Sequence, residues 1–324
     1  MFFGPTGRRE VSTGGSVERG LKALAGFAFP VIVLAACGGG SSGSPVASGD
    51  DCSSTAVLEN GACRTFAVRV EARAPTPFTE NGQPVSLEVV LFRPLEEGAY
   101  PTLVFNHGST GDGSDPSLFG VTFTNKAIAS HFVDRGWMVA FPQRRGRGLS
   151  DGLYDEGFTA DRSAYSCQGN TALAGAERAL EDLDAVTDWI RARADVDVTR
   201  MLVGGTSRGG VLSLAYTARR PDVYLAAVNF VGGWLAEGCG DFESVNRTLF
   251  VEGAGFPGSS LWPYGANDSF YGLAYSRGNF EAFSLAGGLG AFHEFERAPG
   301  LDGHFLVNDA ALWGDTLDEF VDQL

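Results

Sequence analysis

Basic side chains are scarce in this 324-residue chain. It has 24 Lys and Arg residues against 39 Asp and Glu residues, so its formal net charge is −15 at pH 7. An acidic surface repels phosphate backbones, which argues strongly against a nucleic-acid partner. Long apolar runs are scarce as well. The run at the amino terminus, Ala23–Ala36, has 14 residues and is too short to span a bilayer as a mature helix.

Metal-binding spacings are also lacking. No CxxC or HxxxH pair occurs among the five cysteines and four histidines, so we expect no metal and no other cofactor. Cys52 and Cys63 flank a Glu-Asn-Gly turn and are expected to close a small loop. If Cys37 is modified separately, Cys167 and Cys239 remain as a second disulfide, as suits an oxidising compartment.

The first 36 residues have the features of a signal peptide, because basic residues precede the short apolar run. The run ends in Leu-Ala-Ala-Cys37, which resembles the lipobox of bacterial lipoproteins and implies that Cys37 is lipidated. Residues 37–51 are a Gly/Ser-rich tether. We therefore expect an exported domain, residues 52–324, anchored by lipid to the outer membrane or cell surface. The alternative is a secreted or periplasmic protein in which Cys37 is incidental.

Beyond the tether, short apolar runs alternate with helix-like stretches, which predicts one doubly wound α/β sheet, mostly parallel, with helices on both faces. Two segments with period-two alternation should pair antiparallel: Phe66–Arg73 and Val85–Arg93. The further strands expected are Pro101–Asn106, Trp137–Pro142, Met201–Gly204, Leu225–Val231, Ser260–Tyr264 and a last strand within Ala291–Pro299. The helices expected are Thr124–Arg135, Thr171–Arg193, Arg208–Arg219 and Asn308–Gln323.

The motif Gly-x-Ser-x-Gly occurs three times, and its surroundings distinguish the copies. Gly39–Gly43 lies in the tether, and Gly148–Gly152 runs into a segment without helical periodicity. Only Gly205–Gly209 follows an apolar strand and opens a helix. That setting exposes a serine hydroxyl at the carboxyl edge of a sheet, beside a helix amino terminus. Ser207 is therefore the predicted nucleophile, the alternative being a serine that caps a helix.

With these motifs the chain resembles the α/β-hydrolase superfamily, most closely the dienelactone-hydrolase-like and related bacterial esterase group. The resemblance runs from about Val85 to the end and is carried by four segments. They are Asn106–Ser109, Gly205–Gly209, Tyr264–Ser269 and Asp302–His304. Dienelactone hydrolases themselves use a cysteine nucleophile, so the serine here does not carry over their lactone specificity.

The resemblance implies the partners of the nucleophile. His304, in the loop before the last helix, stands where this group places its base, and His293 is a second choice. Asp268 stands where the group places its acid. Two other carboxylates are less suitable: Asp302 is too close to His304 in sequence, and Asp241 follows the preceding strand. The remaining histidines, His107 and His131, are expected to be structural or packing residues.

An oxyanion hole needs two N–H donors. One is expected from Arg208 and the other from Ser109, with Thr110 as the alternative. The arginines of Arg144–Gly148 follow a strand in a turn that resembles one in X-prolyl-dipeptidase-like hydrolases. They are expected to meet a substrate carboxylate or, by the simpler interpretation, to pair with acids such as Asp151 or Asp155.

The sequence thus predicts a serine hydrolase that cleaves a small-molecule carboxylic ester through Ser207, His304 and Asp268. The alternatives are a serine peptidase or amidase with the same triad, and a non-catalytic surface binding module on the same fold. The acyl and alcohol groups and the oligomeric state are not specified by the sequence.

Overall fold

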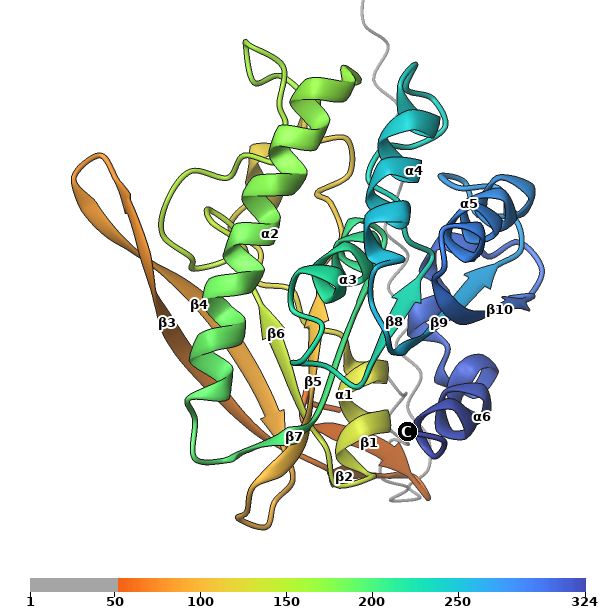
Figure 1. The fold of residues 1–324 in the computed structure, drawn as a ribbon. Coiled ribbons are helices and arrows are strands. Elements are labelled where there is room, and N and C mark those ends of the chain that lie inside the picture. Colours follow the sequence, from red (N-terminus) through yellow and green to blue (C-terminus); the bar gives the residue numbers. More distant parts are fainter. Residues whose placement is uncertain (1–51) are drawn as a thin grey trace, which may run out of the picture. The chain divides into compact units, whose positions relative to one another are not determined.

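The computed structural model describes residues 52–324, and its centre is an eight-stranded sheet (Figure 1). Its strands are β3 (Val68–Glu80), β4 (Gln83–Arg93), β5 (Tyr100–Asn106), β6 (Met138–Pro142), β7 (Val196–Thr206), β8 (Ala226–Phe230), β9 (Ser259–Gly265) and β10 (Leu289–Phe295). The strand order is β10-β9-β8-β7-β5-β6-β4-β3. Only the pairs β3–β4 and β4–β6 are antiparallel, so the sheet is mostly parallel, as predicted. The expectations for the signal peptide, for Cys37 and for the tether concern residues 1–51, outside the described part.

Every strand expected from the sequence is present, and the differences lie at the ends. Strand β7 begins at Val196, several residues before the apolar Met201–Gly204 that identified it. Strand β3 extends to Glu80, where Asn81 and Gly82 turn the chain back into β4. Both turn residues have positive φ, 50° and 75°, which is the conformation that two-residue hairpin turns require.

Helices cover both faces of the sheet. Their bounds are α1 (Lys126–Val133), α2 (Gly169–Arg191), α3 (Arg208–Arg219), α4 (Phe242–Gly253), α5 (Leu273–Leu285) and α6 (Ala310–Val321). Helices α2, α3 and α4 pack against one another and α5 packs on α4, whereas α1 packs on α6. The sequence analysis did not predict α4 and α5. None of the helices in residues 52–324 is long and apolar enough to cross a membrane.

A row of aromatic rings crosses the sheet and ends at α6. Phe92 on β4 meets Phe141 on β6, whose ring meets Phe105 on β5, with centroid separations of 5.7 and 6.0 Å. Phe105 is 6.2 Å from Phe230 on β8, and Trp313 of α6 lies 5.2 Å beyond it. All five side chains are buried. This row joins strands that are far apart in sequence into one core.

Both expected disulfides are present. Cys52, before β1 (Ala56–Glu59), is joined to Cys63 within β2 (Ala62–Thr65), and the turn between the two strands is the Asn-Gly pair. Cys167 and Cys239 are 72 residues apart and join the loops that precede α2 and α4.

Candidate active site

Ser207 is the single residue between β7 and α3, and its backbone has a strained conformation. Its φ is 56° and its ψ is −124°, in a region that costs a non-glycine residue about 1–3 kcal/mol. The glycines on either side are needed for this sharp turn. A Cβ atom on Gly205 would lie 2.4 Å from the carbonyl carbon of Gly209, and one on Gly209 would lie 2.1 Å from the Asn106 oxygen. No larger residue fits at either position.

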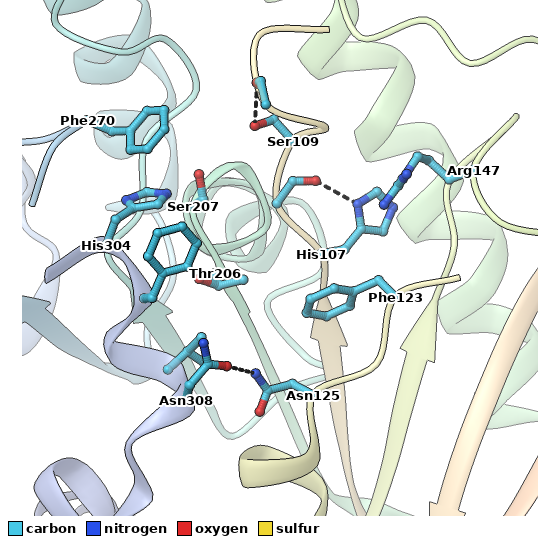
Figure 2. A pocket seen from close by; sticks show the side chains of 14 residues that line it. His107, Ser109, Phe123, Asn125, Arg147, Thr206, Ser207, Phe270, His304 and Asn308 are labelled. Atoms are coloured by element: carbon cyan, nitrogen blue, oxygen red, sulfur yellow. Dashed lines mark hydrogen bonds between the residues drawn. The ribbon is translucent and has the colours of Figure 1, made fainter. Parts of the chain in front are cut away.

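His304 and Asp268 come from separate loops and meet beside this turn. His304 Nδ1 lies 3.0 Å from Oδ2 and 3.1 Å from Oδ1 of Asp268. Oδ1 also accepts hydrogen bonds from the backbone N–H groups of Phe270 and Tyr271. Ser207 and His304 line the same cavity, with the Phe270 ring against the imidazole (Figure 2). The structure therefore brings together the serine, histidine and aspartate that the sequence singled out.

The other acids considered have different partners. Asp302 accepts hydrogen bonds from the backbone N–H of His304 and from Ser269. Although partial burial opposes it, these bonds from Ser269 and His304 lower the pKa of Asp302. Asp241 accepts from the N–H of Gly169 at the start of α2. Asp302 thus orders the loop that carries His304, and Asp241 orders a helix end.

The other histidines have partners or positions unlike those of His304. His107 is fully buried, its Nδ1–H donates to the Gly108 oxygen, and its Nε2 accepts from the N–H of Arg144. Burial and the nearby Arg144 and Arg147 hold its pKa well below the usual value, so the ring is neutral. His131 connects α1 to α6 through Asp318, and His293 lies on the edge strand β10. We therefore interpret all three as structural residues.

The two expected oxyanion donors flank Ser207. Arg208 is the first residue of α3. The Ser207–Arg208 peptide is fixed because the Ser207 oxygen accepts hydrogen bonds from the N–H groups of Gly210 and Gly233. On the other side, a Cβ on Gly108 would be only 3.1 Å from Ser207 Cβ, so the turn before Ser109 lies against the nucleophile. The backbone N–H of the alternative donor, Thr110, donates a hydrogen bond to the Tyr165 hydroxyl.

Two cavities meet at Ser207. The first, of about 240 Å³, extends past His304 toward Phe123, Arg147 and a hydrogen-bonded pair of asparagines, Asn125 and Asn308 (Figure 2). The second, of about 190 Å³, shares Ser109, Gly111, Ser207 and Phe270 with the first. Its walls include Tyr165, Trp234, Tyr271 and both cysteines of the Cys167–Cys239 disulfide. Ser207 is therefore accessible from both cavities.

The arginines after β6 are buried, and their expected partners were wrong. Asp151 pairs with Arg73 and Asp155 pairs with Arg162. Arg144 pairs instead with Glu156, and Arg145 with Asp182 and Glu181. Glu156 was not singled out from the sequence. Arg147, also buried, donates instead to the backbone oxygens of Leu118 and Phe119. Three acids, Asp151, Asp155 and Glu156, stand close together in that loop, and the sequence does not distinguish them.

Comparison with known proteins agrees with this architecture. A family model described as X-Pro dipeptidyl-peptidase (S15 family) matches residues 81–237, which include Ser207 but end before Asp268 and His304. No curated protein sequence matches the chain.

Several solved structures have a similar fold. The esterase Est1E from Butyrivibrio proteoclasticus, solved with ferulic acid, is 16% identical over 76% of this chain and 98% of its own, with a TM-score of 0.52. An acetyl xylan esterase from Paenibacillus sp. R4 is 14% identical over 79% of this chain and 89% of its own, with a TM-score of 0.53. The acylaminoacyl peptidase from Pyrococcus horikoshii is 16% identical over 79% of this chain but only 41% of its own, with a TM-score of 0.54.

The fold is therefore that of the α/β-hydrolase class, which includes both esterases and peptidases. The chain's sequence is similar to the S15 peptidase family over residues 81–237.

Proposed function

We propose that this protein is a serine hydrolase that cleaves carboxylic esters of small molecules. The observation that carries the proposal is the meeting of Ser207 and His304 at one cavity, with Asp268 bound to the imidazole. Asp268 hydrogen-bonds His304 Nδ1, and the imidazole shares a cavity wall with Ser207 on its strained turn.

In the proposed reaction, His304 Nε2 takes the Ser207 proton as the hydroxyl oxygen attacks the ester carbonyl. Asp268 keeps the other ring proton on Nδ1 and stabilises the imidazolium. The backbone N–H groups of Ser109 and Arg208 hold the oxyanion. His304 then returns the proton to the departing alkoxide, and water hydrolyses the acyl-enzyme by the same steps. No cofactor takes part in this scheme.

Both cavities favour small groups, and the larger of the two favours uncharged or anionic ones. Volumes of about 240 and 190 Å³ are below the ~300–1,000 Å³ that drug-sized ligands occupy. The lining residues of the larger cavity include Arg147 and no carboxylate. A free amino terminus bound in this cavity would lack a partner for its charge, so the larger cavity favours an ester group over a free peptide terminus. The smaller cavity differs, because Asp112 lines it.

Peptide cleavage is the second candidate, and it is favoured by the similarity to the S15 family over residues 81–237. A panel of p-nitrophenyl esters with acyl chains of two to eight carbons and a matched panel of aminoacyl p-nitroanilides distinguishes the two activities. We expect kcat/KM to be highest for the short esters. Labelling of Ser207 by a fluorophosphonate tests the third possibility, a non-catalytic binding module, which would not react.

We further propose that the enzyme acts outside the cytoplasm, anchored by lipid on Cys37 and joined to its anchor by residues 38–51. The sequence Leu-Ala-Ala-Cys37 after a short apolar run supports the anchor. The two disulfides of residues 52–324 support export to an oxidising compartment.

A further inference from the structure

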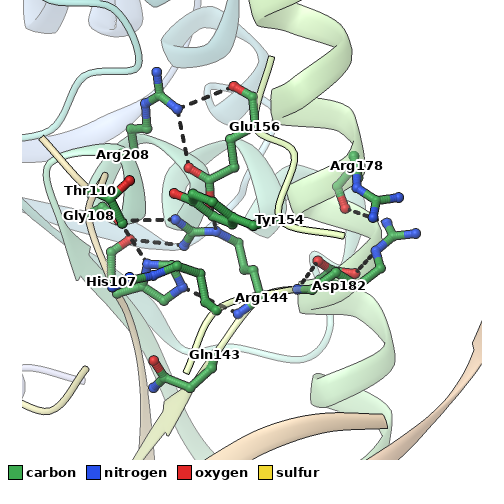
Figure 3. Close-up of polar contacts among 12 residues, drawn as sticks. His107, Gly108, Thr110, Gln143, Arg144, Tyr154, Glu156, Arg178, Asp182 and Arg208 are labelled. Carbon is green, nitrogen blue, oxygen red and sulfur yellow. Dashed lines mark hydrogen bonds and ion pairs between the residues drawn. The ribbon is translucent and has the colours of Figure 1, made fainter. Parts of the chain in front are cut away.

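Behind the active site lies a buried ion triad of Arg144, Glu156 and Arg208 (Figure 3). Glu156 Oε1 is 2.5 Å from Arg144 Nε, and Oε2 is 3.2 Å from Arg208 Nη1. The three residues are between 2% and 4% exposed. One carboxylate therefore connects two guanidinium groups that approach it from opposite sides.

On one side, Arg144 holds the turn that precedes Ser109. Its Nη1 donates to the His107 oxygen at 2.9 Å, and its Nη2 donates to the Gly108 oxygen at 3.2 Å. The Gly108 oxygen also accepts from His107 Nδ1 at 2.7 Å. The C=O of Gly108 and the N–H of Ser109 belong to one planar trans peptide and point in opposite directions. Holding the oxygen therefore fixes the direction of the Ser109 N–H.

On the other side, Arg208 is the residue that follows the nucleophile. Its guanidinium lies between the rings of Tyr165 and Trp234, at 3.7 and 4.4 Å from their centroids. Its Nε donates to the Trp234 oxygen at 3.0 Å, and its Nη1 also donates to the backbone oxygen of Glu156. The side chain is therefore fixed in one position, and with it the residue whose backbone N–H faces the oxyanion in the proposed mechanism.

Glu156 itself lies on a loop whose backbone packs closely against helix α2. A Cβ on Gly175 of that helix would lie 2.2 Å from the carbonyl carbon of Glu156, and one on Gly157 would lie 2.6 Å from the Thr171 oxygen. The carboxylate is thus placed by backbone contacts with a helix that contributes no residue to the triad of Ser207, His304 and Asp268. Its position does not depend on the loops that carry His304 and Asp268.

We propose that Glu156 is a positioning residue for the oxyanion hole: through Arg144 and Arg208, one buried carboxylate sets the two backbone donors at a fixed separation. This inference rests on the proposed function, because it takes the N–H groups of Ser109 and Arg208 as the donors. Glu156 touches neither substrate nor nucleophile and acts only through the two arginines.

The test compares Glu156→Gln with a matched control, Asp182→Asn. Asp182 is also a buried carboxylate, 2.6 Å from Nε of the next arginine, Arg145, but no bond joins that pair to the oxyanion turn (Figure 3). A second variant, Arg144→Lys, keeps the positive charge beside Glu156. It loses the two guanidinium N–H groups that bind the carbonyl oxygens of His107 and Gly108. Each full-length protein is titrated to completion with a fluorophosphonate, so that rates are expressed per competent Ser207, and its melting temperature is recorded.

For Glu156→Gln we expect kcat on p-nitrophenyl acetate to fall about 10²-fold per competent site with little change in KM, the loss typical of one oxyanion donor. The rate of phosphonylation and the affinity for a boronic acid that forms a tetrahedral adduct should fall in parallel. Arg144→Lys should show a smaller loss of the same kind. Asp182→Asn should lower the melting temperature without this loss in kcat.

Two outcomes would overturn the inference. One is that Glu156→Gln and Asp182→Asn lose stability alike and keep the wild-type kcat and phosphonylation rate per site. The other is that KM rises while kcat is unchanged. If the wild-type protein itself does not react with the fluorophosphonate at Ser207, then the proposed function fails instead. The phosphonylation rate separates the two failures, because it needs no ester substrate.

Discussion

His304 Nδ1 lies 3.0 Å from Oδ2 of Asp268, a residue 36 positions earlier in the chain. The carboxylate does not depend on the histidine for its place, since two backbone N–H groups of its own loop, from Phe270 and Tyr271, also bind it. The aspartate is a preformed acceptor that orients the imidazole, and in the proposed mechanism this leaves Nε2 free to act as a base.

Asp268→Asn should therefore inactivate the enzyme while preserving the fold. An amide at this position no longer favours the tautomer with the proton on Nδ1, and we expect kcat to fall about 10⁴-fold. Ester hydrolysis and circular dichroism of the purified variant check both parts. Asp241→Asn is the control and should keep most activity. If Asp241→Asn were the inactive variant, the assignment of the acid would be wrong.

Ser207→Ala should abolish hydrolysis, with a loss of at least about 10⁴-fold in kcat, because no other nucleophile stands on the turn. Ser150→Ala, in the second Gly-x-Ser-x-Gly motif, should keep activity. Ser150 donates to the Gln143 oxygen and accepts from the Glu88 N–H, so its loss is expected to cost stability only. Active-site labelling with a fluorophosphonate, followed by peptide mapping, measures the same distinction directly. Label found on Ser150 would contradict it.

Removal of either disulfide should lower the free energy of unfolding by about 2–4 kcal/mol. The entropic contribution is expected to be larger for Cys167–Cys239, whose cysteines are 72 residues apart, than for Cys52–Cys63, 11 apart. Only the Cys167–Cys239 pair lines a cavity beside Ser207. Only the Cys167→Ser/Cys239→Ser variant should therefore also change KM. Urea unfolding and steady-state kinetics of the two double variants test this. Equal changes in KM would show that the cavity wall has no part in binding.

Stability should decrease in mild acid because of His107. Burial, with help from Arg144 and Arg147, holds the pKa of His107 well below 6.5 in the folded protein. Below pH 6.5 the unfolded chain therefore binds a proton that the folded protein does not. The contribution of neutral His107 to the free energy of unfolding is complete above pH 6.5. It falls by up to about 1.4 kcal/mol per pH unit below that pH.

The free energy of unfolding, measured by urea titration between pH 7.5 and 5, checks this prediction. His107→Gln can still donate and accept in place of the two ring nitrogens, and it does not titrate. Its stability should depend less steeply on pH than that of the wild type. A variant with an unchanged slope would assign the acid sensitivity to other groups.

The lipid anchor is tested with Cys37→Ser in the full chain expressed in a bacterium. The wild type should incorporate labelled palmitate and partition into detergent, because several acyl chains are needed for stable membrane binding. The variant should do neither. Soluble behaviour of both proteins would instead support a secreted enzyme.

The parallel sheet was predictable from sequence because its central strands contain continuous apolar runs. Strands β5, β6 and β8 are buried along their whole length, and a strand covered on both faces appears as a continuous hydrophobic run. Helix α5 was not predictable in the same way. Ser276, Asn279 and Phe283 are its only buried residues, so its sequence lacks a clear apolar stripe, and Gly278 lies in its middle. Contacts with β9, β10 and α4 hold it in place.

The three residues of the proposed triad were predictable because their positions follow from the order of the strands along the chain. Ser207, Asp268 and His304 each follow a strand of a parallel sheet, and the carboxyl ends of such strands meet at one edge. Glu156 was not predictable because its role depends on which of three neighbouring acids turns inward. That choice is made by the packing of its loop on Gly175, a contact that local sequence does not encode.

The residues around Ser207 also differ in how well they should tolerate substitution in protein engineering. Gly205, Gly209 and Gly210 have no room for a side chain, so variation at these positions would displace Ser207 itself. Phe123, Phe270 and Phe305, in contrast, line the larger cavity from loops and a short 3₁₀ turn outside that crowded frame. Libraries confined to these three positions should change which substrates are accepted while leaving the geometry of the nucleophile intact.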